Sequence, residues 1–323
     1  MTERRFALTI SLLAVLLAAL AGLSLGAANI DLWAALTQPA STAGVILRHV
    51  RLPRVLATLL AGAGLGAAGA ILQSVLHNPL AAPNIIGVNA GAGFGATLCL
   101  ALLPAASAAM VGASAFAGAL LAAALVYAVA RGAGASRLAL VLAGVALSML
   151  FTAGVDALTT FWPDCLPASS HFKIGSAANA TLRTVYPALA LVPLCLIAAF
   201  TLHRELDVLA LGDETAQSLG ANPKRLRAVF LLLACALAAS AVSLMGLIGF
   251  VGLLAPHGAR MWVGGENGRV LPLSAALGAA FLTLCDLAAR TLFAPFELPV
   301  GILLAALGAP FFLWLLIRRR AHD

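Results

Sequence analysis

No acidic residue occurs between Asp31 and Asp156, a stretch that is rich in Ala, Gly, Leu and Val. Within it, residues 51–95 read RLPRVLATLLAGAGLGAAGAILQSVLHNPLAAPNIIGVNAGAGFG, which is two apolar segments separated by His77-Asn78-Pro79. Soluble domains contain about 25% charged residues, so a segment this apolar needs lipid rather than water around it. The pattern predicts a pair of closely packed membrane helices.

The rest of the chain has the same character, because 62% of its 323 residues are hydrophobic and only 10% are charged. A membrane-spanning helix needs about 20 apolar residues. The sequence therefore predicts an all-α, polytopic membrane protein with about ten spans in a single transmembrane domain, 1–323. The predicted spans cover residues 6–27, 53–75, 85–103, 108–130, 137–160, 184–202, 227–246, 247–262, 270–292 and 299–317. The first has the look of a signal peptide, but its apolar core exceeds the about 7–15 residues of such peptides, so we expect an uncleaved span.

The positive charges predict the orientation of the spans. Cytoplasmic loops of membrane proteins accumulate Lys and Arg, and most of the 19 Lys and Arg fall on one side if both termini face the cytoplasm. The same rule accounts for the net charge of +7, so no nucleic-acid partner is expected. Arg51, Arg54 and Arg290 are exceptions, because they fall on the predicted outer side.

Two arginine-led apolar runs indicate internal symmetry. Arg51-x-x-Arg54 precedes a run that ends at Asn78-Pro79, and Arg225-x-Arg227 precedes one that ends at Pro256-His257. The first run starts outside and the second starts inside. This pattern predicts two five-helix halves in inverted orientation.

Regularly spaced glycines predict close helix contacts. Gly62 and Gly66 are four residues apart, as are Gly87, Gly91 and Gly95, and small residues at this spacing let membrane helices approach each other. Residues 64–69 also match GxGxxG, but no strand precedes them and no acid follows about twenty residues on, so a dinucleotide site is excluded. The chain contains no phosphate-binding loop, and we expect it not to hydrolyse ATP.

The scattered ionisable residues form no catalytic motif. The five cysteines include no CxxC pair, and the six histidines are dispersed, so no metal site is expected. Asp286 lies deep in a predicted span, where a carboxylate is a functional candidate, and Arg290 would share its helix face. We expect a structural ion pair, with a proton relay as the alternative.

The longest polar stretch lies at about 204–226, on the predicted cytoplasmic side. Asp213-Glu214-Thr215 is a plausible helix start, with acids near the positive end of the helix dipole, and Gly220 is a plausible stop. The stretch is either a surface linker or an amphipathic element on which a cytoplasmic partner docks.

Several motifs in the same order resemble one transporter family over nearly the whole chain. They are Arg51-Leu-Pro-Arg54, Gln73 with Asn78-Pro79 and Gly87, Leu211-Gly212-Asp213-Glu214-Thr215 with Leu219-Gly220, Gly249 with Pro256-His257 and Arg260, Asp286 with Arg290, and Glu297 with Gly301 and Pro310. The chain resembles the permease subunits of type II ABC importers, which carry iron-siderophores, haem and vitamin B12.

The resemblance implies partners and roles. Two permease copies, identical or paralogous, would surround a translocation path in the bacterial inner membrane, with cytoplasmic ATPase subunits below and a periplasmic binding protein above. ATP and Mg would bind to the ATPase, and this chain would need no cofactor. Arg51, Arg54 and Arg290 match outward arginines that meet glutamates of the binding protein.

The same comparison assigns the remaining site residues. Residues 211–222 match the loop that seats in the ATPase, so Leu211, Gly212, Asp213, Glu214, Thr215, Leu219 and Gly220 are expected to couple ATP hydrolysis to transport. Helix packing or the path is expected to involve Gly62, Gly66, Gly87, Gly91, Gly95, Asn78, Pro79, Pro256 and His257.

Departures from the family pattern concern the cargo. His77 replaces the usual Arg before Asn-Pro, and Lys173 lies where a Trp-containing stretch is usual. The hypothesis is a ferric siderophore permease, with haem and vitamin B12 as alternatives within the family. A proton-coupled secondary transporter that uses Asp286 and a structural membrane scaffold are the alternatives from other classes.

Overall fold

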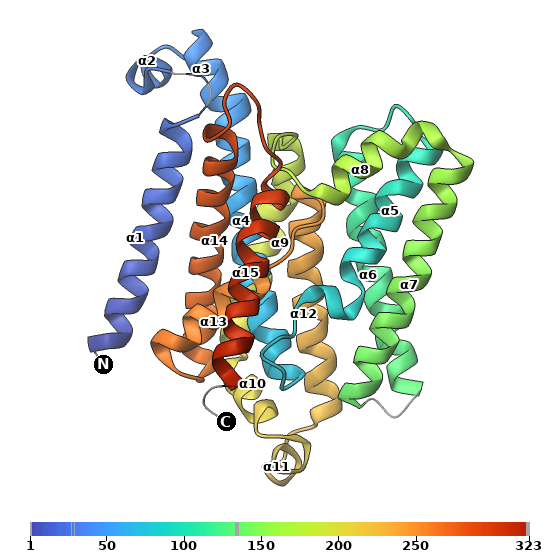
Figure 1. The fold of residues 1–323 in the computed structure, drawn as a ribbon. Coiled ribbons are helices and arrows are strands. Elements are labelled where there is room, and N and C mark those ends of the chain that lie inside the picture. Colours follow the sequence, from blue (N-terminus) through green and yellow to red (C-terminus); the bar gives the residue numbers. More distant parts are fainter. Residues whose placement is uncertain (1, 27, 29, 133–135, 321–323) are drawn as a thin grey trace.

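Long apolar helices run side by side through the molecule (Figure 1). The computed structural model describes residues 2–26, 28, 30–132 and 136–320. In these ranges, seven helical segments are long and apolar enough to cross a membrane, and two apolar helices are shorter. These segments match nine of the ten predicted spans.

The bounds of the long helices follow the apolar windows closely. The seven segments are α1 (Thr2–Ser24), a run formed by α3 (Thr42–Ile46), a π-helical turn (Leu47–Arg51) and α4 (Leu52–Val75), then α6 (Ala108–Gly132), α7 (Arg137–Phe161), α9 (Leu182–Thr201), α12 (Pro223–Met245) and α14 (Asn267–Thr291). The two shorter apolar helices are α5 (Val88–Leu102) and residues 300–313 of α15 (Val300–Arg320).

The predicted eighth span, 247–262, is wrong at its start. Residues 247–250 are not helical, and α13 covers only Val251–Val263. Gly246 and Phe250 have positive φ angles of 74° and 66°, which turn the chain sharply between α12 and α13. The glycine needs no compensation for this conformation, whereas a positive φ is uncommon for a residue such as Phe250.

Short helices lie at the two ends of the bundle (Figure 1). One end carries α2 (Leu32–Thr37) and α8 (Leu166–Ile174), and the other carries α10 (His203–Ala210) and α11 (Asp213–Ser218). Two 3₁₀ turns, Pro83–Ile86 and Pro163–Cys165, complete the described elements. The sequence predicted the start of α11 at Asp213, but it did not predict α8 or α10.

Helix α4 is packed on several sides, against α12, α13 and α14. Its glycines make this possible, because a Cβ at Gly62 would overlap the carbonyl oxygen of Gly278 on α14, and one at Gly69 would overlap that of Gly252 on α13. Gly66 likewise lies against the backbone of α14. Helices α5 and α6 meet in the same way, at Gly91 and Gly118.

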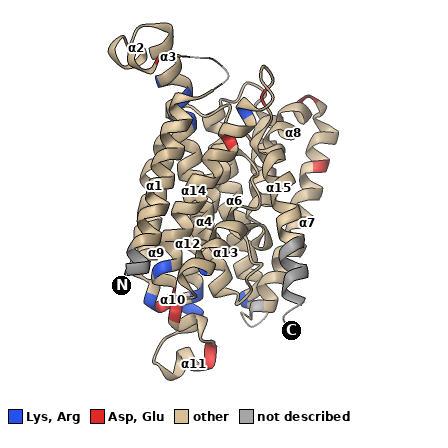
Figure 2. Cartoon of the chain, turned by 60° about the vertical axis from the view of Figure 1, so that its left-hand side comes forward, with Lys and Arg blue, Asp and Glu red and all other residues tan. Residues whose placement is uncertain are grey.

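The charges gather mainly at the two ends of this bundle, with few in its middle (Figure 2). The beginning of α1 and the end of α15 lie at the same end as α10 and α11 (Figure 1). This arrangement fits a chain that crosses the membrane an even number of times. Which end faces the cytoplasm stays a prediction, as does the inverted relation of the two halves.

Candidate functional site

An arginine cluster lies at the end of the bundle opposite α11. It consists of Arg51, Arg54, Asp286, Arg290 and Glu297. Arg54 of α4 donates from Nε to Asp286 Oδ2 at 2.9 Å and from Nη2 to Asp286 Oδ1 at 3.1 Å. Its Nη1 donates to Glu297 Oε2 at 2.8 Å. Arg54 therefore ties α4 to α14 and to the loop that follows α14.

The other two arginines of the cluster bind the end of α1. Arg51 donates from Nη1 to the carbonyls of Leu23 and Ser24 at 2.7 and 2.6 Å, and from Nη2 to the carbonyl of Ala28. Arg290 donates to the Gly22 carbonyl at 2.6 Å. The last carbonyls of a helix lack partners within the helix and attract cations, so both arginines cap α1.

These arginines differ from the sequence expectation in their exposure. The sequence predicted them as outward-facing, but Arg51, Arg54 and Arg290 are only 2%, 5% and 4% exposed. Asp286 is 2% exposed, and its Oδ2 also lies 3.7 Å from Arg290 Nε. The predicted pairing of Asp286 with Arg290 is present, although Arg54 makes the shorter contact. Hydropathy and charge sidedness could not reveal this burial, because the partners come from helices far apart in the sequence.

The loop predicted at about 204–226 lies at the opposite end of the bundle. We call residues 203–222 the coupling segment, after the role that the sequence predicts for this loop. Gly212 has a φ of 107° and separates α10 from α11. Asp213, at the start of α11, accepts two hydrogen bonds from Arg227 Nη2, at 2.7 and 2.9 Å. Arg227 is buried on α12. The ion pair therefore fixes α11 against the beginning of α12.

Helix α11 ends in a Schellman motif around Gly220. The amide of Ala221 donates to the Ala216 carbonyl at 3.0 Å, and that of Gly220 donates to the Gln217 carbonyl at 2.9 Å. This motif requires a left-handed residue, and Gly220 has a φ of 79°. The turns leave Leu211 and Leu219 62% and 61% exposed, so the segment presents two large apolar side chains at its surface.

The predicted packing and path residues are distributed over the molecule and do not form one site. Asn78 closes the turn after α4, where its Oδ1 accepts from the Leu80 amide at 2.9 Å. Pro256 is buried in α13, and the ring of His257 meets that of Phe311 edge to face at 6.4 Å. Gly87 has a φ of 76° at the start of α5.

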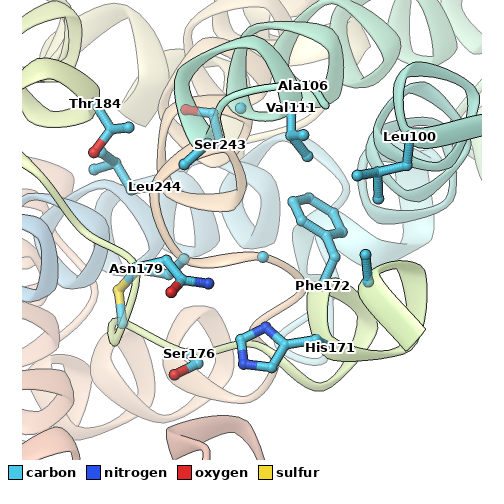
Figure 3. A pocket seen from close by; sticks show the side chains of 15 residues that line it. Leu100, Ala106, Val111, His171, Phe172, Ser176, Asn179, Thr184, Ser243 and Leu244 are labelled. Atoms are coloured by element: carbon cyan, nitrogen blue, oxygen red, sulfur yellow. The ribbon is translucent and has the colours of Figure 1, made fainter. Parts of the chain in front are cut away.

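A cavity of about 290 Å³ opens between α5, α6, α8, α9 and the end of α12. In Figure 3, Leu100, Val111 and Phe172 lie on one side of it, and polar side chains such as Asn179 and Thr184 lie on the other. A second cavity of about 220 Å³ shares Thr184 and Ser243 with it and extends between α6 and α9. Sequence reasoning pointed to Lys173 nearby, which is exposed on α8, but did not predict the cavity.

The described residues include no group of three or more His, Cys, Asp or Glu side chains that could hold a metal ion. The five cysteines, Cys99, Cys165, Cys195, Cys235 and Cys285, are buried and free.

Comparison with known proteins gives consistent matches over nearly the whole chain. A model of the FecCD transport family matches residues 9–318. The iron(3+)-hydroxamate import system permease protein FhuB of Bacillus subtilis is 38% identical over 99% of this chain and 86% of its own length. The hemin transport system permease protein HmuU of Yersinia pestis is 36% identical over 98% of this chain and 97% of its own length.

A solved structure shares the fold. It is described as an inward-facing conformation of a metal-chelate type ABC transporter, and it superposes with a TM-score of 0.86 at 33% identity. The match covers 97% of this chain and 99% of the other. The fold of this chain therefore also occurs in an ABC transporter.

Proposed function

Because this chain belongs to the FecCD transport family, we propose that it forms the membrane path for a ferric siderophore. It is a multi-pass membrane protein and the permease subunit of an ABC importer for metal chelates. Its relatives are permease proteins of import systems rather than enzymes in their own right. The family match over residues 9–318 is the observation that carries the proposal.

The cargo proposal is supported by the names of similar proteins. A relative that imports an iron(3+)-hydroxamate and one that transports hemin are similar to this chain to nearly the same degree, at 38% and 36% identity. Iron held by an organic chelator is common to both. A ferric siderophore is the cargo that we propose, and hemin and vitamin B12 are the competing outcomes of the test.

The coupling segment is proposed as the contact with the ATPase. The fully buried core of a protein interface is more apolar than its rim, and the exposed Leu211 and Leu219 would supply apolar contact area there. The ion pair between Asp213 and Arg227 and the Schellman motif at Gly220 fix the shape of the segment before a partner arrives. A preformed surface binds at lower entropic cost than a flexible one.

The arginine cluster is proposed as the docking site of the binding protein. Because its arginines are buried, we propose that the exposed Glu297 makes the first contact. Glu297 is the one member of the cluster whose side chain is substantially exposed, at 43%, and its carboxylate accepts a hydrogen bond from Nη1 of Arg54. A carboxylate from a docked protein could take the place of Glu297 on Arg54. Docking would then act directly on the ion pair between α4 and the loop that follows α14.

A second permease copy, identical or paralogous, is proposed as the other wall of the path. Helices α7 and α15 carry exposed large apolar side chains, including Met149, Leu150 and Leu307. Lipid covers such faces in a lone chain, and a second copy could replace the lipid on part of them. Cross-linking between cysteines introduced on α7 would test this contact.

Reconstitution tests the function. The chain is purified with its cognate ATPase and binding protein and placed in vesicles, and uptake of iron from a ferric hydroxamate is measured with ATP. We expect uptake that requires ATP and persists when a protonophore collapses the pH gradient. Uptake that follows the pH gradient and ignores ATP would refute the importer. Faster uptake of hemin or vitamin B12 would identify that compound as the cargo and would leave the proposal of an ATP-driven importer unchanged.

A further inference from the structure

A chain of polar side chains joins the coupling segment to α4, α13 and α14. Asp207 of α10 accepts hydrogen bonds at 2.8 Å from both the backbone and the side-chain nitrogen of Asn267, the first residue of α14. Asn267 Oδ1 accepts from Ser74 Oγ of α4 at 2.8 Å. Ser74 Oγ in turn accepts from Arg260 Nη2 of α13 at 3.0 Å. We call these four residues the α10 network.

The centre of this network is shielded from solvent. Asn267 is 1% exposed and Ser74 is 5% exposed. A buried polar group that loses its partner carries the full cost of its desolvation, and hydrogen bonds are stronger in such surroundings than in water. The four side chains therefore favour one relative placement of α4, α10, α13 and α14.

Asp207 also serves as the cap of α14. The residue in the N-cap position, Glu266, makes no capping hydrogen bond with its own side chain. The Asp207 carboxylate binds the first amide of the helix instead, where negative charge is favoured by the helix dipole. The cap comes from another helix, so α10 cannot move away from α14 without uncapping it.

Two further contacts hold α10 in place. His77 Nε2 donates to the Leu209 carbonyl at 3.0 Å, which ties α10 to the turn after α4. The ring of His203 lies so close to Gly268 that a Cβ there would come within 2.7 Å of its Cδ2. Leu206 and Leu209 are fully buried. Helix α10 is thus attached to the bundle. The exposed Leu211 and Leu219 lie just before and just after α11.

We propose that the α10 network transmits the movement of the coupling segment to α4, α13 and α14, with Asn267 as the positioning residue. The proposal rests on the proposed function, because it assumes that an ATPase moves the segment. A displacement of α10 would carry the first turn of α14 through the Asp207 cap. Through Ser74 and Arg260, the same displacement would reach the ends of α4 and α13.

The test uses the permease reconstituted with its ATPase and binding protein in vesicles, with a ferric hydroxamate as the probe. Two variants interrupt the network, Asn267→Ala at its centre and Ser74→Ala beside it. Ser274→Ala is the matched control, because Ser274 is a buried α14 serine whose hydroxyl has no hydrogen-bond partner among the described residues. The readouts are ATP hydrolysed per iron imported and the melting midpoint of the complex.

We expect Asn267→Ala and Ser74→Ala to assemble with the ATPase and to hydrolyse ATP. The ATP used per imported iron should rise at least about fivefold, the lower end of usual coupling between sites. Ser274→Ala should keep the wild-type ratio. Asp207→Asn retains a carbonyl oxygen that can accept from the Asn267 amide, so it should keep more coupling than Asp207→Ala.

Two results would overturn the proposal. One is a wild-type ratio in both network variants, and the other is an equal fall in hydrolysis and transport together with a lower melting midpoint, which indicates a purely structural role. The proposed function has a separate indicator, since wild-type vesicles that show no ATP-dependent uptake contradict the importer itself. The network is judged only in vesicles where the wild type transports.

Discussion

Arg54 on α4 donates hydrogen bonds from Nε and Nη2 to the two carboxylate oxygens of Asp286 on α14, at 2.9 and 3.1 Å. Both side chains are almost completely buried. The two residues lie 232 positions apart in the sequence. Their contact joins helices from the two predicted halves of the chain at the end opposite the coupling segment. An ion pair of this kind is costly to break from one side, because the remaining charge stays buried.

The first prediction concerns Asp286→Ala. This change leaves Arg54 and Arg290 buried without their shared carboxylate, and removal of one partner from a buried pair costs about 3–5 kcal/mol. The melting midpoint of the purified protein in detergent should fall strongly. Glu297→Ala is the control, since its side chain is 43% exposed and exposed pairs contribute only about 0–1 kcal/mol. Equal effects of the two substitutions would contradict the internal role of Asp286.

The second prediction separates capping from docking at Arg51. Arg51→Ala removes the donors to the Leu23, Ser24 and Ala28 carbonyls. These carbonyls are partly buried or exposed, so the loss should lie at or below the lower end of the about 1–3 kcal/mol that a buried acceptor without a partner costs. The melting midpoint should fall, while Arg48→Ala, at an exposed arginine three residues earlier, should leave it unchanged. If Arg51→Ala melts like the wild type but no longer retains the binding protein in a pull-down, the capping role is wrong.

The third prediction compares two buried glycines. Gly69→Ala forces a methyl group into the carbonyl of Gly252, and overpacking of this kind costs about 1–3 kcal/mol. Gly93→Ala places its methyl 3.7 Å from Leu247, an ordinary contact, and alanine favours a helix by about 1 kcal/mol over glycine. The two melting midpoints should move in opposite directions. A rise for Gly69→Ala would show that α4 and α13 are not in close contact.

The fourth prediction concerns the turn after α11. A Cβ at Gly220 meets no atom within 4 Å, so Gly220→Trp points a large ring outward into the proposed ATPase contact. ATP hydrolysis should proceed while transport falls, in assays of both rates on the same vesicles. Gly220→Ala is the control, because it carries the same backbone strain, about 1–2 kcal/mol for a left-handed residue, without the bulk. Normal transport by the Trp variant would exclude this surface from coupling.

The sequence predicted the long helices well because each depends on a local property. A window of apolar residues already specifies a span, so the predicted 53–75 and 137–160 lie within one residue of α4 (Leu52–Val75) and α7 (Arg137–Phe161) at either end. Asp213 and Gly220 likewise specify the start and stop of α11 locally, through the helix dipole and the left-handed turn.

The remainder depends on contacts between distant segments, which apolarity does not encode. The burial of Arg54 follows from Asp286, and the α10 network requires Asp207 and Asn267, 60 residues apart, to meet. The sequence did not predict α10, because the apolar face of this helix consists of only a few residues, including Leu206 and Leu209. The start of α13 was missed because backbone angles at Gly246 and Phe250, rather than composition, decide where that helix begins.

The outward-facing Leu211 and Leu219 have a consequence for the making of this protein. Two large aliphatic side chains in water at the tip of the bundle favour self-association until something covers them. A cell that produced the permease in excess of its cytoplasmic partner would accumulate a chain prone to aggregation. Balanced synthesis of the two subunits would avoid that hazard.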